Sequence, residues 1–256
     1  SSAASDVYKR QAEYAYTNND ICDFVNGSWS PANPMSNIWS SSYKAIQICN
    51  QYLAEFQGLT FDELKLNDDY RAQMFRYTNS FKEARFLRAY FYFNLVRAYG
   101  DVPYFTEMVT TDQVNSLTRT PAQEIFNAII AECDKLSTEL PADYTKLGLD
   151  GIAPAENGRV TCYAALALKA RAALYAASPL FNPENNKDLW RRAAEANKEV
   201  IETCTANGFK LSKYSELWGP NNWSNNEMIF VRRYNGNIST LEELSLIHIS
   251  EPTRHS

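Results

Sequence analysis

One segment, residues 81–105, constrains the fold of this chain more than any other, and it reads FKEARFLRAYFYFNLVRAYGDVPYF. Nearly every position between 86 and 99 is apolar or aromatic, so the apolar face is far wider than the stripe of an ordinary surface helix. The pattern predicts a long helix that neighbouring elements cover on almost every side. We expect Gly100 to end it, with Asp101 and Pro103 preventing its continuation.

The charged residues of the same segment follow a helical spacing. Arg85, Arg88 and Arg97 lie near one side of the expected helix. Glu83 precedes them in the chain, and we predict that it pairs with them along the helix.

An earlier helix is predicted around a stripe formed by Trp39, Tyr43, Ile46 and Asn50, with Ser36 as its N-cap. The simplest interpretation of this stripe is core packing. A first helix is expected over residues 6–16, and the loop over residues 18–37 is rich in turn-forming residues.

Two further helices are predicted after residue 105. Thr120 is the expected cap of one, with Pro121 at its first helical position, followed by an apolar ladder of Ile125, Ile129, Cys133 and Leu136. The next is alanine-rich and buried, in the segment RVTCYAALALKARAALYAASPLFN, and its partner helix is expected over residues 188–204. In the partner, Leu189, Ala193, Ala196 and Val200 should face inward.

These elements predict a mainly α fold. Two helix–turn–helix units, near residues 83–140 and 161–204, suggest an irregular tetratricopeptide-like array with long loops. Residues 209–211 and 228–234 are the strand candidates, so we expect only a minor β element near the C-terminus. Long loops on a rigid helical frame are where binding groups are expected.

Composition excludes several functions. The chain has 256 residues, 45% hydrophobic content and a formal net charge of −5, which is typical of a globular protein and argues against nucleic-acid binding. Its longest apolar run, residues 163–179, contains Lys169 and Arg171 and reads as a buried helix rather than a membrane span. No secretory signal is visible in SSAASDVYKR. The five cysteines form no CxxC pair and are interpreted as small buried thiols.

Both histidines, His248 and His255, lie in the final stretch LSLIHISEPTRHS. This tail resembles the translation of a sequencing adapter, so we expect the authentic sequence to end near Leu244. The predicted organisation is a single helical domain over residues 1–244, the N-terminal part of a longer protein, with residues 245–256 as a non-native tail. The 247 residues before His248 contain no histidine, so discounting the tail removes histidine-based acid–base catalysis and the commonest transition-metal ligand.

Several blocks in order resemble the SusD/RagB family, the glycan-binding lipoproteins of the Bacteroidetes outer membrane. The blocks are WSSSYKAIQICNQYL, KEARFLRAYFYFNLVRAYGDVPYF, TPAQEIFNAIIAECDKLSTELP, GRVTCYAALALKARAALYAASPLFN, LWRRAAEANKEVI and NNEMIFVRRYN. Family members are about twice as long as this chain, so the resemblance implies a missing C-terminal portion.

The resemblance implies a non-catalytic protein that binds oligosaccharide or polysaccharide at the cell surface and passes it to a SusC-like TonB-dependent transporter. It also implies attachment to the outer membrane through an N-terminal lipid whose cysteine would precede Ser1. The helical repeats would face the transporter, while loops would hold the glycan.

Sugar recognition combines flat aromatic faces with amide and carboxylate side chains. Two loops supply that mixture, and from them we select Asn26 and Trp29 in the first and Asn222 and Trp223 in the second as candidate ligand-binding residues. Trp218 is interpreted as a core aromatic.

No catalytic residue, metal site or cofactor is predicted. Asp68 and Asp69, like Glu242 and Glu243, are adjacent carboxylates that should be solvated surface, and no calcium-loop spacing occurs. Two alternatives stay open. A tetratricopeptide-type scaffold that binds only protein predicts buried Trp29 and Trp223, and a glycoside hydrolase, the least favoured, would need a carboxylate pair in one cleft.

Overall fold

The structure is a computed structural model that describes residue 30 and residues 38–149, 158–217 and 225–231. The helices below belong to one compact unit, Ile38–Arg232. The helix expected over residues 6–16, the loop over residues 18–37 apart from residue 30, and the C-terminal tail lie outside the described residues.

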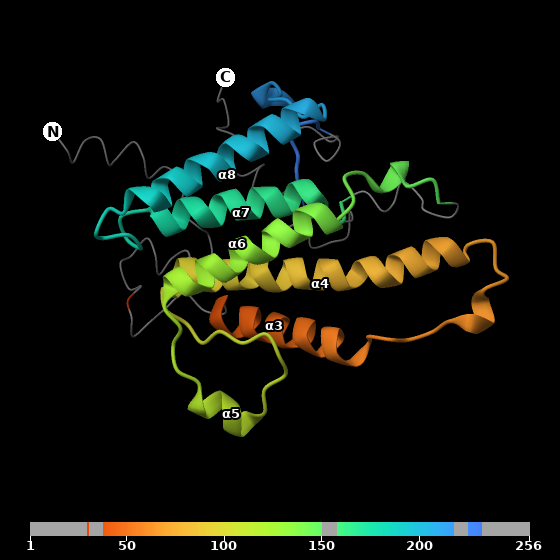
Figure 1. Cartoon of the computed structure of the whole chain (residues 1–256), viewed down its shortest axis with the longest axis horizontal. Helices are drawn as coiled ribbons and strands as arrows, with labels where there is room; N and C mark the ends of the chain where they lie inside the picture. The colour runs from red at the N-terminus through yellow and green to blue at the C-terminus, as the bar shows by residue number, and fades with distance from the viewer. Residues whose placement is uncertain (1–29, 31–37, 150–157, 218–224, 232–256) are drawn as a thin grey trace, which may run out of the picture. The chain divides into compact units, whose positions relative to one another are not determined.

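Five long helices run in alternating directions through this unit (Figure 1). They are α3 (Ile38–Glu55), α4 (Tyr70–Tyr99), α6 (Ala122–Glu139), α7 (Cys162–Ala177) and α8 (Lys187–Ala206). Shorter elements join them: α5 (Thr111–Ser116) and the 3₁₀ turns η1 (Asp62–Leu64), η2 (Tyr144–Lys146) and η4 (Tyr214–Glu216).

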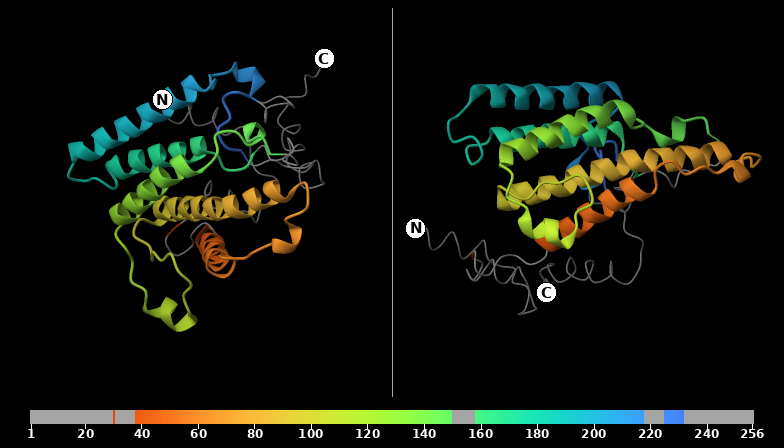
Figure 2. Two further views of the ribbon diagram at one scale, coloured as in Figure 1. Left: turned by 45° about the vertical axis from the view of Figure 1, so that its right-hand side comes forward. Right: turned by 60° about the horizontal axis from the view of Figure 1, so that its bottom comes forward.

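Each long helix packs against the next along the chain, and α4 also touches α7. The two further views show the same succession from α3 to α8 (Figure 2). This arrangement confirms the mainly α fold and both predicted helix–turn–helix units, α4 with α6 and α7 with α8. No described helix is long and apolar enough to cross a membrane.

Helix α4 is the buried spine that its sequence predicts. Phe86, Tyr92, Phe93 and Leu95 are at most 2% exposed. The helix ends at Gly100, whose N–H donates to the Val96 carbonyl at 2.9 Å. Gly100 has φ +70° and ψ −124°, a conformation that costs a residue with a Cβ far more than glycine.

The segment after Gly100, residues 101–107, returns along α3 and α4, and tyrosines from both helices hold its backbone. The Tyr43 hydroxyl donates to the Pro103 carbonyl at 2.8 Å. The Tyr92 hydroxyl donates to the Phe105 carbonyl at 2.6 Å and accepts the Phe105 N–H at 2.9 Å. Burial raises the pKa of both phenols. The two tyrosines thus satisfy backbone groups that a neighbouring strand would satisfy in a sheet.

The start of α6 differs from the prediction in its cap. The helix begins at Ala122 with Pro121 as N-cap, and the Asp101 carboxylate accepts the Ala122 N–H at 2.8 Å. Thr120 lies one residue further out, where its N–H pairs with the Val102 carbonyl in an isolated antiparallel bridge. The predicted cap is wrong because this bridge fixes the Thr120 backbone outside the helix.

Glu83 does not pair along α4 as predicted. Its carboxylate accepts hydrogen bonds from Nε and Nη2 of Arg159, both at 2.8 Å. Arg159 lies in the segment that leads into α7. Arg85 instead reaches across to Glu132 and Glu139 of α6, each at 2.6 Å. Tertiary partners replace the local pairing because these side chains lie against neighbouring elements rather than in open solvent.

Helices α7 and α8 pack through small side chains, as predicted. Ala193 and Ala196 of α8 are buried against the core, and Leu189 and Val200 are partly buried against it. Lys169 of α7 bonds to Asp134 of α6 at 2.5 Å and to Glu199 of α8 at 2.7 Å, so its charge is paired on both sides.

The stripe on α3 and the thiols also follow their predictions. Ile46 and Asn50 are buried, and Trp39 and Tyr43 pack against the same core. The described cysteines are all free thiols: Cys49, Cys133 and Cys204 are buried and Cys162 is partly so. Burial raises the pKa of Cys133 to about 12.

The minor β element near the C-terminus is not confirmed. Residues 209–211 have irregular backbone, as do residues 228–231, the described part of the second strand candidate. One backbone hydrogen bond, from Lys210 N–H to the Asn226 carbonyl, joins the two regions at 3.3 Å. Side-chain bonds compete with a ladder here, because the Ser212 N–H donates to the Glu227 carboxylate.

Replacing Arg159 with methionine tests the Glu83 pair. The side chains are only 16% and 25% exposed, so we expect Arg159→Met to lower the free energy of unfolding by about 2 to 3 kcal/mol. Urea unfolding measures this, and the double variant with Glu83→Gln should recover part of the loss. Lys65→Met is the control, because the pair with Asp62 is exposed and should change stability by less than about 0.5 kcal/mol. If Arg159→Met and Lys65→Met lowered the free energy of unfolding equally, the buried pair would not be the stronger one.

Alkaline pH should destabilise the fold through Tyr43, Tyr92 and Tyr144, whose folded-state pKa values burial raises above the ordinary 10.0. Below that pH both states keep the phenolic protons. Above it the unfolded chain ionises first, so each tyrosine removes up to about 1.4 kcal/mol per pH unit. Urea unfolding at several pH values above about 10 measures how steeply the free energy of unfolding falls with pH, and this slope should be shallower in Tyr92→Phe. A free energy of unfolding that does not change over this pH range would contradict the prediction.

Candidate functional site

The four ligand-binding residues selected from the sequence, Asn26, Trp29, Asn222 and Trp223, lie outside the described residues, as does Trp218. They remain predictions. The candidate site built below comes from a different part of the chain, the region where η1 leads into α4.

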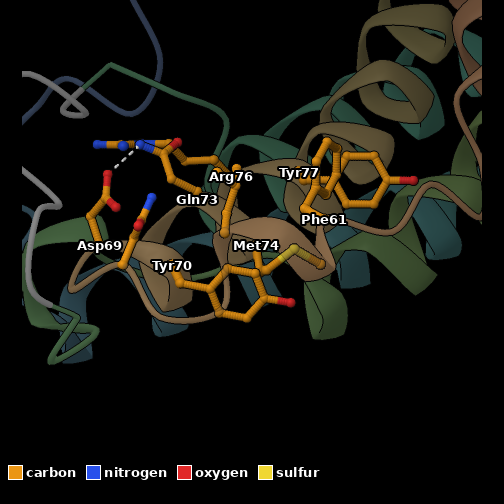
Figure 3. A pocket seen from close by; sticks show the side chains of 9 residues that line it. Phe61, Asp69, Tyr70, Gln73, Met74, Arg76 and Tyr77 are labelled. Atoms are coloured by element: carbon orange, nitrogen blue, oxygen red, sulfur yellow. Dashed lines mark hydrogen bonds between the residues drawn. The ribbon is translucent and has the colours of Figure 1, made fainter.

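A pocket of about 490 Å³ lies beside the first turns of α4. This volume is within the range of small-molecule sites, roughly 300 to 1,000 Å³. Aromatic, amide and charged side chains gather around it (Figure 3), and its lining residues are Phe61, Leu64, Asn67, Asp69, Tyr70, Gln73, Met74, Arg76 and Tyr77.

Helical spacing brings most of the lining together. Tyr70, Gln73, Met74 and Tyr77 recur at three- and four-residue steps, so they share one face of α4. The wall opposite comes from the 3₁₀ turn Asp62–Leu64, which begins directly after Phe61. This turn stands outside α4 and leaves the helical face partly uncovered.

Tyr77 anchors the aromatic end of the pocket. Its hydroxyl donates to the Phe56 carbonyl at 2.6 Å and accepts the Leu59 N–H at 3.0 Å, which ties the loop after α3 to α4. The Phe61 ring packs edge-on against the Tyr77 ring, with centroids 5.2 Å apart. These contacts hold two aromatic side chains in fixed positions on one side of the pocket (Figure 3).

Polar groups occupy the other end. Gln73 donates from Nε2 to the Asp69 carboxylate at 3.0 Å, which orients both side chains (Figure 3). Tyr70 and Asn67 add a phenol and an amide to the lining, and neither side chain forms a hydrogen bond within the described part of the chain. The pocket therefore offers both donors and acceptors to a ligand.

This arrangement suits binding better than catalysis. Flat aromatic faces with amide and carboxylate groups at one end match a sugar, whose rings present CH faces and hydroxyl edges. Asp69 is the one carboxylate among the lining residues, so they provide no acid and base pair for glycoside cleavage. No cluster of three or more metal-ligating side chains occurs in the described ranges.

Sequence reasoning treated Asp69 as solvated surface. The residue is exposed, as predicted, but it also lines the pocket and binds Gln73. The signal that points to this face is the helical spacing of Tyr70, Gln73 and Tyr77 after the polar turn residue Asn67. The spacing alone does not show that η1 folds opposite to it.

Comparison with known proteins relates this chain to one group. The family model described as "Starch-binding associating with outer membrane", SusD-like_3, matches residues 1–174. A curated relative, SusD-like protein P25 of Formosa agariphila, is 23% identical over 197 residues, which is 77% of this chain and 31% of the relative.

Solved structures that resemble this chain are also SusD-like proteins. A SusD-like carbohydrate-binding protein of Bacteroides fragilis is 26% identical, with a TM-score of 0.63, and the match covers 88% of this chain and 38% of that protein. A laminarin-binding SusD-like protein is 25% identical, with a TM-score of 0.60, over 82% of this chain and 40% of that protein. The chain thus spans well under half the length of each relative.

Tyr77→Phe tests whether the hydroxyl of Tyr77 holds the pocket wall. The variant loses two hydrogen bonds to the backbone of residues 56–59, so we expect it to be less stable by about 1 kcal/mol and its Leu59 amide to exchange faster with solvent. Hydrogen exchange and urea unfolding measure both effects. Tyr70→Phe is the matched control and should change neither quantity, and indistinguishable variants would contradict this account of the wall.

Proposed function

This chain belongs to the SusD-like family of starch-binding proteins that associate with the outer membrane, and we propose that it binds an oligosaccharide or polysaccharide without cleaving it. The family match, which covers residues 1–174, is the observation that carries the proposal. Two structural relatives, described as carbohydrate-binding and laminarin-binding, support the same ligand class.

The chemistry of the pocket beside α4 supports a saccharide ligand independently. Phe61 and Tyr77 provide immobilised aromatic faces, while Asp69 and Gln73 provide oriented polar groups. A ligand that combines apolar ring faces with hydroxyl groups uses both ends of such a pocket. We include this pocket in the proposed glycan-binding surface, with Tyr70 as a further contact.

The loop residues selected from the sequence remain part of the proposal. Trp29 and Trp223 would stack on sugar rings, and Asn26 and Asn222 would bond to hydroxyl groups. A polysaccharide is long enough to use several contact areas on one protein, so the loop residues and the pocket are compatible as separate contacts.

We further propose that the bound glycan is delivered to a SusC-like TonB-dependent transporter at the cell surface, with the chain held at the outer membrane by an N-terminal lipid. The family description, which names association with the outer membrane, supports this location. The array from α3 to α8 offers a rigid helical frame for a protein partner.

Affinity electrophoresis through gels that contain laminarin or starch tests glycan binding. We expect the chain to be retarded by at least one of the two. The retardation should weaken about tenfold in Tyr70→Ala, which removes a contact in the pocket, and in Trp29→Ala or Trp223→Ala, which remove a stacking ring. Tyr90→Ala is the matched control, since Tyr90 is an exposed tyrosine of α4 that does not line the pocket.

The pattern of results separates the hypotheses. If only Tyr70→Ala weakens the retardation, the glycan is recognised beside α4. If only Trp29→Ala and Trp223→Ala weaken it, the glycan is recognised in the loops. A chain that no gel retards favours the tetratricopeptide-type scaffold. New reducing ends after incubation with either polysaccharide would contradict non-catalytic binding and favour the hydrolase.

A further inference from the structure

A second pocket, of about 240 Å³, lies between α4 and α6. It shares no lining residue with the pocket of Figure 3. Its polar lining comes from three elements: Arg85 and Arg88 of α4, Tyr104 and Thr106 of the return segment, and Glu132 of α6. Ala89, Ala128 and Ile129 complete an apolar wall.

Arg88 carries a charge that no carboxylate balances. Its Nη1 donates to the Asn50 Oδ1 at 2.8 Å and to the Thr106 carbonyl at 2.8 Å, and both acceptors are neutral. Within the described ranges Arg88 forms no ion pair, and its Nε and Nη2 form no hydrogen bond. The side chain is thus held in place through one nitrogen while its other donors stay available.

The carboxylate in the same pocket is already neutralised. Glu132 accepts Nε of Arg85 at 2.6 Å, and Arg85 also bonds to Glu139 at 2.6 Å. Hydrogen bonds and charge attraction from these two carboxylates raise the pKa of Arg85 despite its burial. Among the residues that line the pocket, two guanidinium groups face one carboxylate, and that carboxylate is paired with Arg85, so the lining carries an excess of positive charge at Arg88.

Tyr104 supplies a further donor. Its ring packs on Tyr92 with centroids 4.6 Å apart, but its hydroxyl forms no hydrogen bond in the described part of the chain. Burial raises the pKa of Tyr104, an effect that Arg88 opposes and Glu132 reinforces, so the phenol lies near both charges and is protonated at neutral pH. A protonated phenol beside a guanidinium can donate to the same acceptor.

We propose that this pocket binds an oxyanion group, a carboxylate or a sulfate, carried by a small ligand. Nε and Nη2 of Arg88 form the planar fork that matches an oxyanion with two hydrogen bonds, and the Tyr104 hydroxyl provides a third. The apolar wall of Ala89, Ala128 and Ile129 would contact the uncharged remainder of the ligand. An acidic monosaccharide has this combination of groups.

Calorimetric titration of the full chain with sodium glucuronate, glucose and sodium sulfate at low ionic strength tests the site. We expect glucuronate to bind at least about tenfold more tightly than glucose, because only the acid can use the charge of Arg88. Tyr104→Phe should weaken glucuronate binding about tenfold while leaving the melting temperature unchanged, since the hydroxyl has no partner to lose. Arg88→Gln should abolish binding.

Arg97→Gln is the matched control, because Arg97 lies on the same helix, stacks on Phe93 and does not line the pocket. Sulfate that competes with glucuronate would show that the oxyanion itself is bound, and glucuronate binding without such competition would show that the carboxylate must be attached to a sugar. Both results support the proposal.

Three results would overturn it: equal affinity for glucose and glucuronate, no binding of either anion, or glucuronate binding that survives in Tyr104→Phe and in Arg88→Gln. Tyr104→Phe keeps the test decisive even if Arg88→Gln fails to fold through the loss of its bonds to Asn50 and Thr106. Because the titration uses no polysaccharide, its failure is distinguishable from a failure of the glycan-binding proposal.

Discussion

The backbone of residues 101–107 has to be satisfied without a partner strand, and the rest of the helical unit depends on how this is done. Gly100 turns the chain, and Tyr92 and Arg88 of α4 bond to the returning carbonyl groups. A buried backbone group without a partner costs about as much as a lost hydrogen bond, so these polar side chains are required inside an otherwise apolar helix. The first residues of the same segment hold the start of α6, because the Asp101 carboxylate accepts the Ala122 N–H and Val102 pairs with Thr120.

The same requirement explains why both pockets border α4. At its start, η1 stands away from the helix and Tyr77 ties the preceding loop down, which leaves an aromatic and amide surface open. In its middle, Arg88 is bound to the return segment through one nitrogen, and the same side chain lines the second pocket. Groups needed for the architecture thus also supply the chemistry available to a ligand.

Much of the fold is predictable from local pattern. The apolar run of α4, the stripe on α3 and the alanines of α7 each specify a helix and the face that it buries. The side-chain pairing is not predictable in this way: Glu83 bonds to Arg159, far away in the sequence, and Asp101 rather than Thr120 caps α6. Such partners depend on which segments meet in space, which spacing along one helix does not specify.

The sequence by itself determined the helical class, the order of the helices, the stop at Gly100 and the family, because these depend on composition and on short-range periodicity. Only the tertiary structure decided where polar groups converge. The pocket lined by Asp69 and Tyr77 requires η1 to fold opposite α4, and the excess charge of Arg88 becomes evident only once Glu132 is seen to be paired with Arg85. Burial and pairing are properties of three-dimensional contacts, so no pattern along the chain could reveal them.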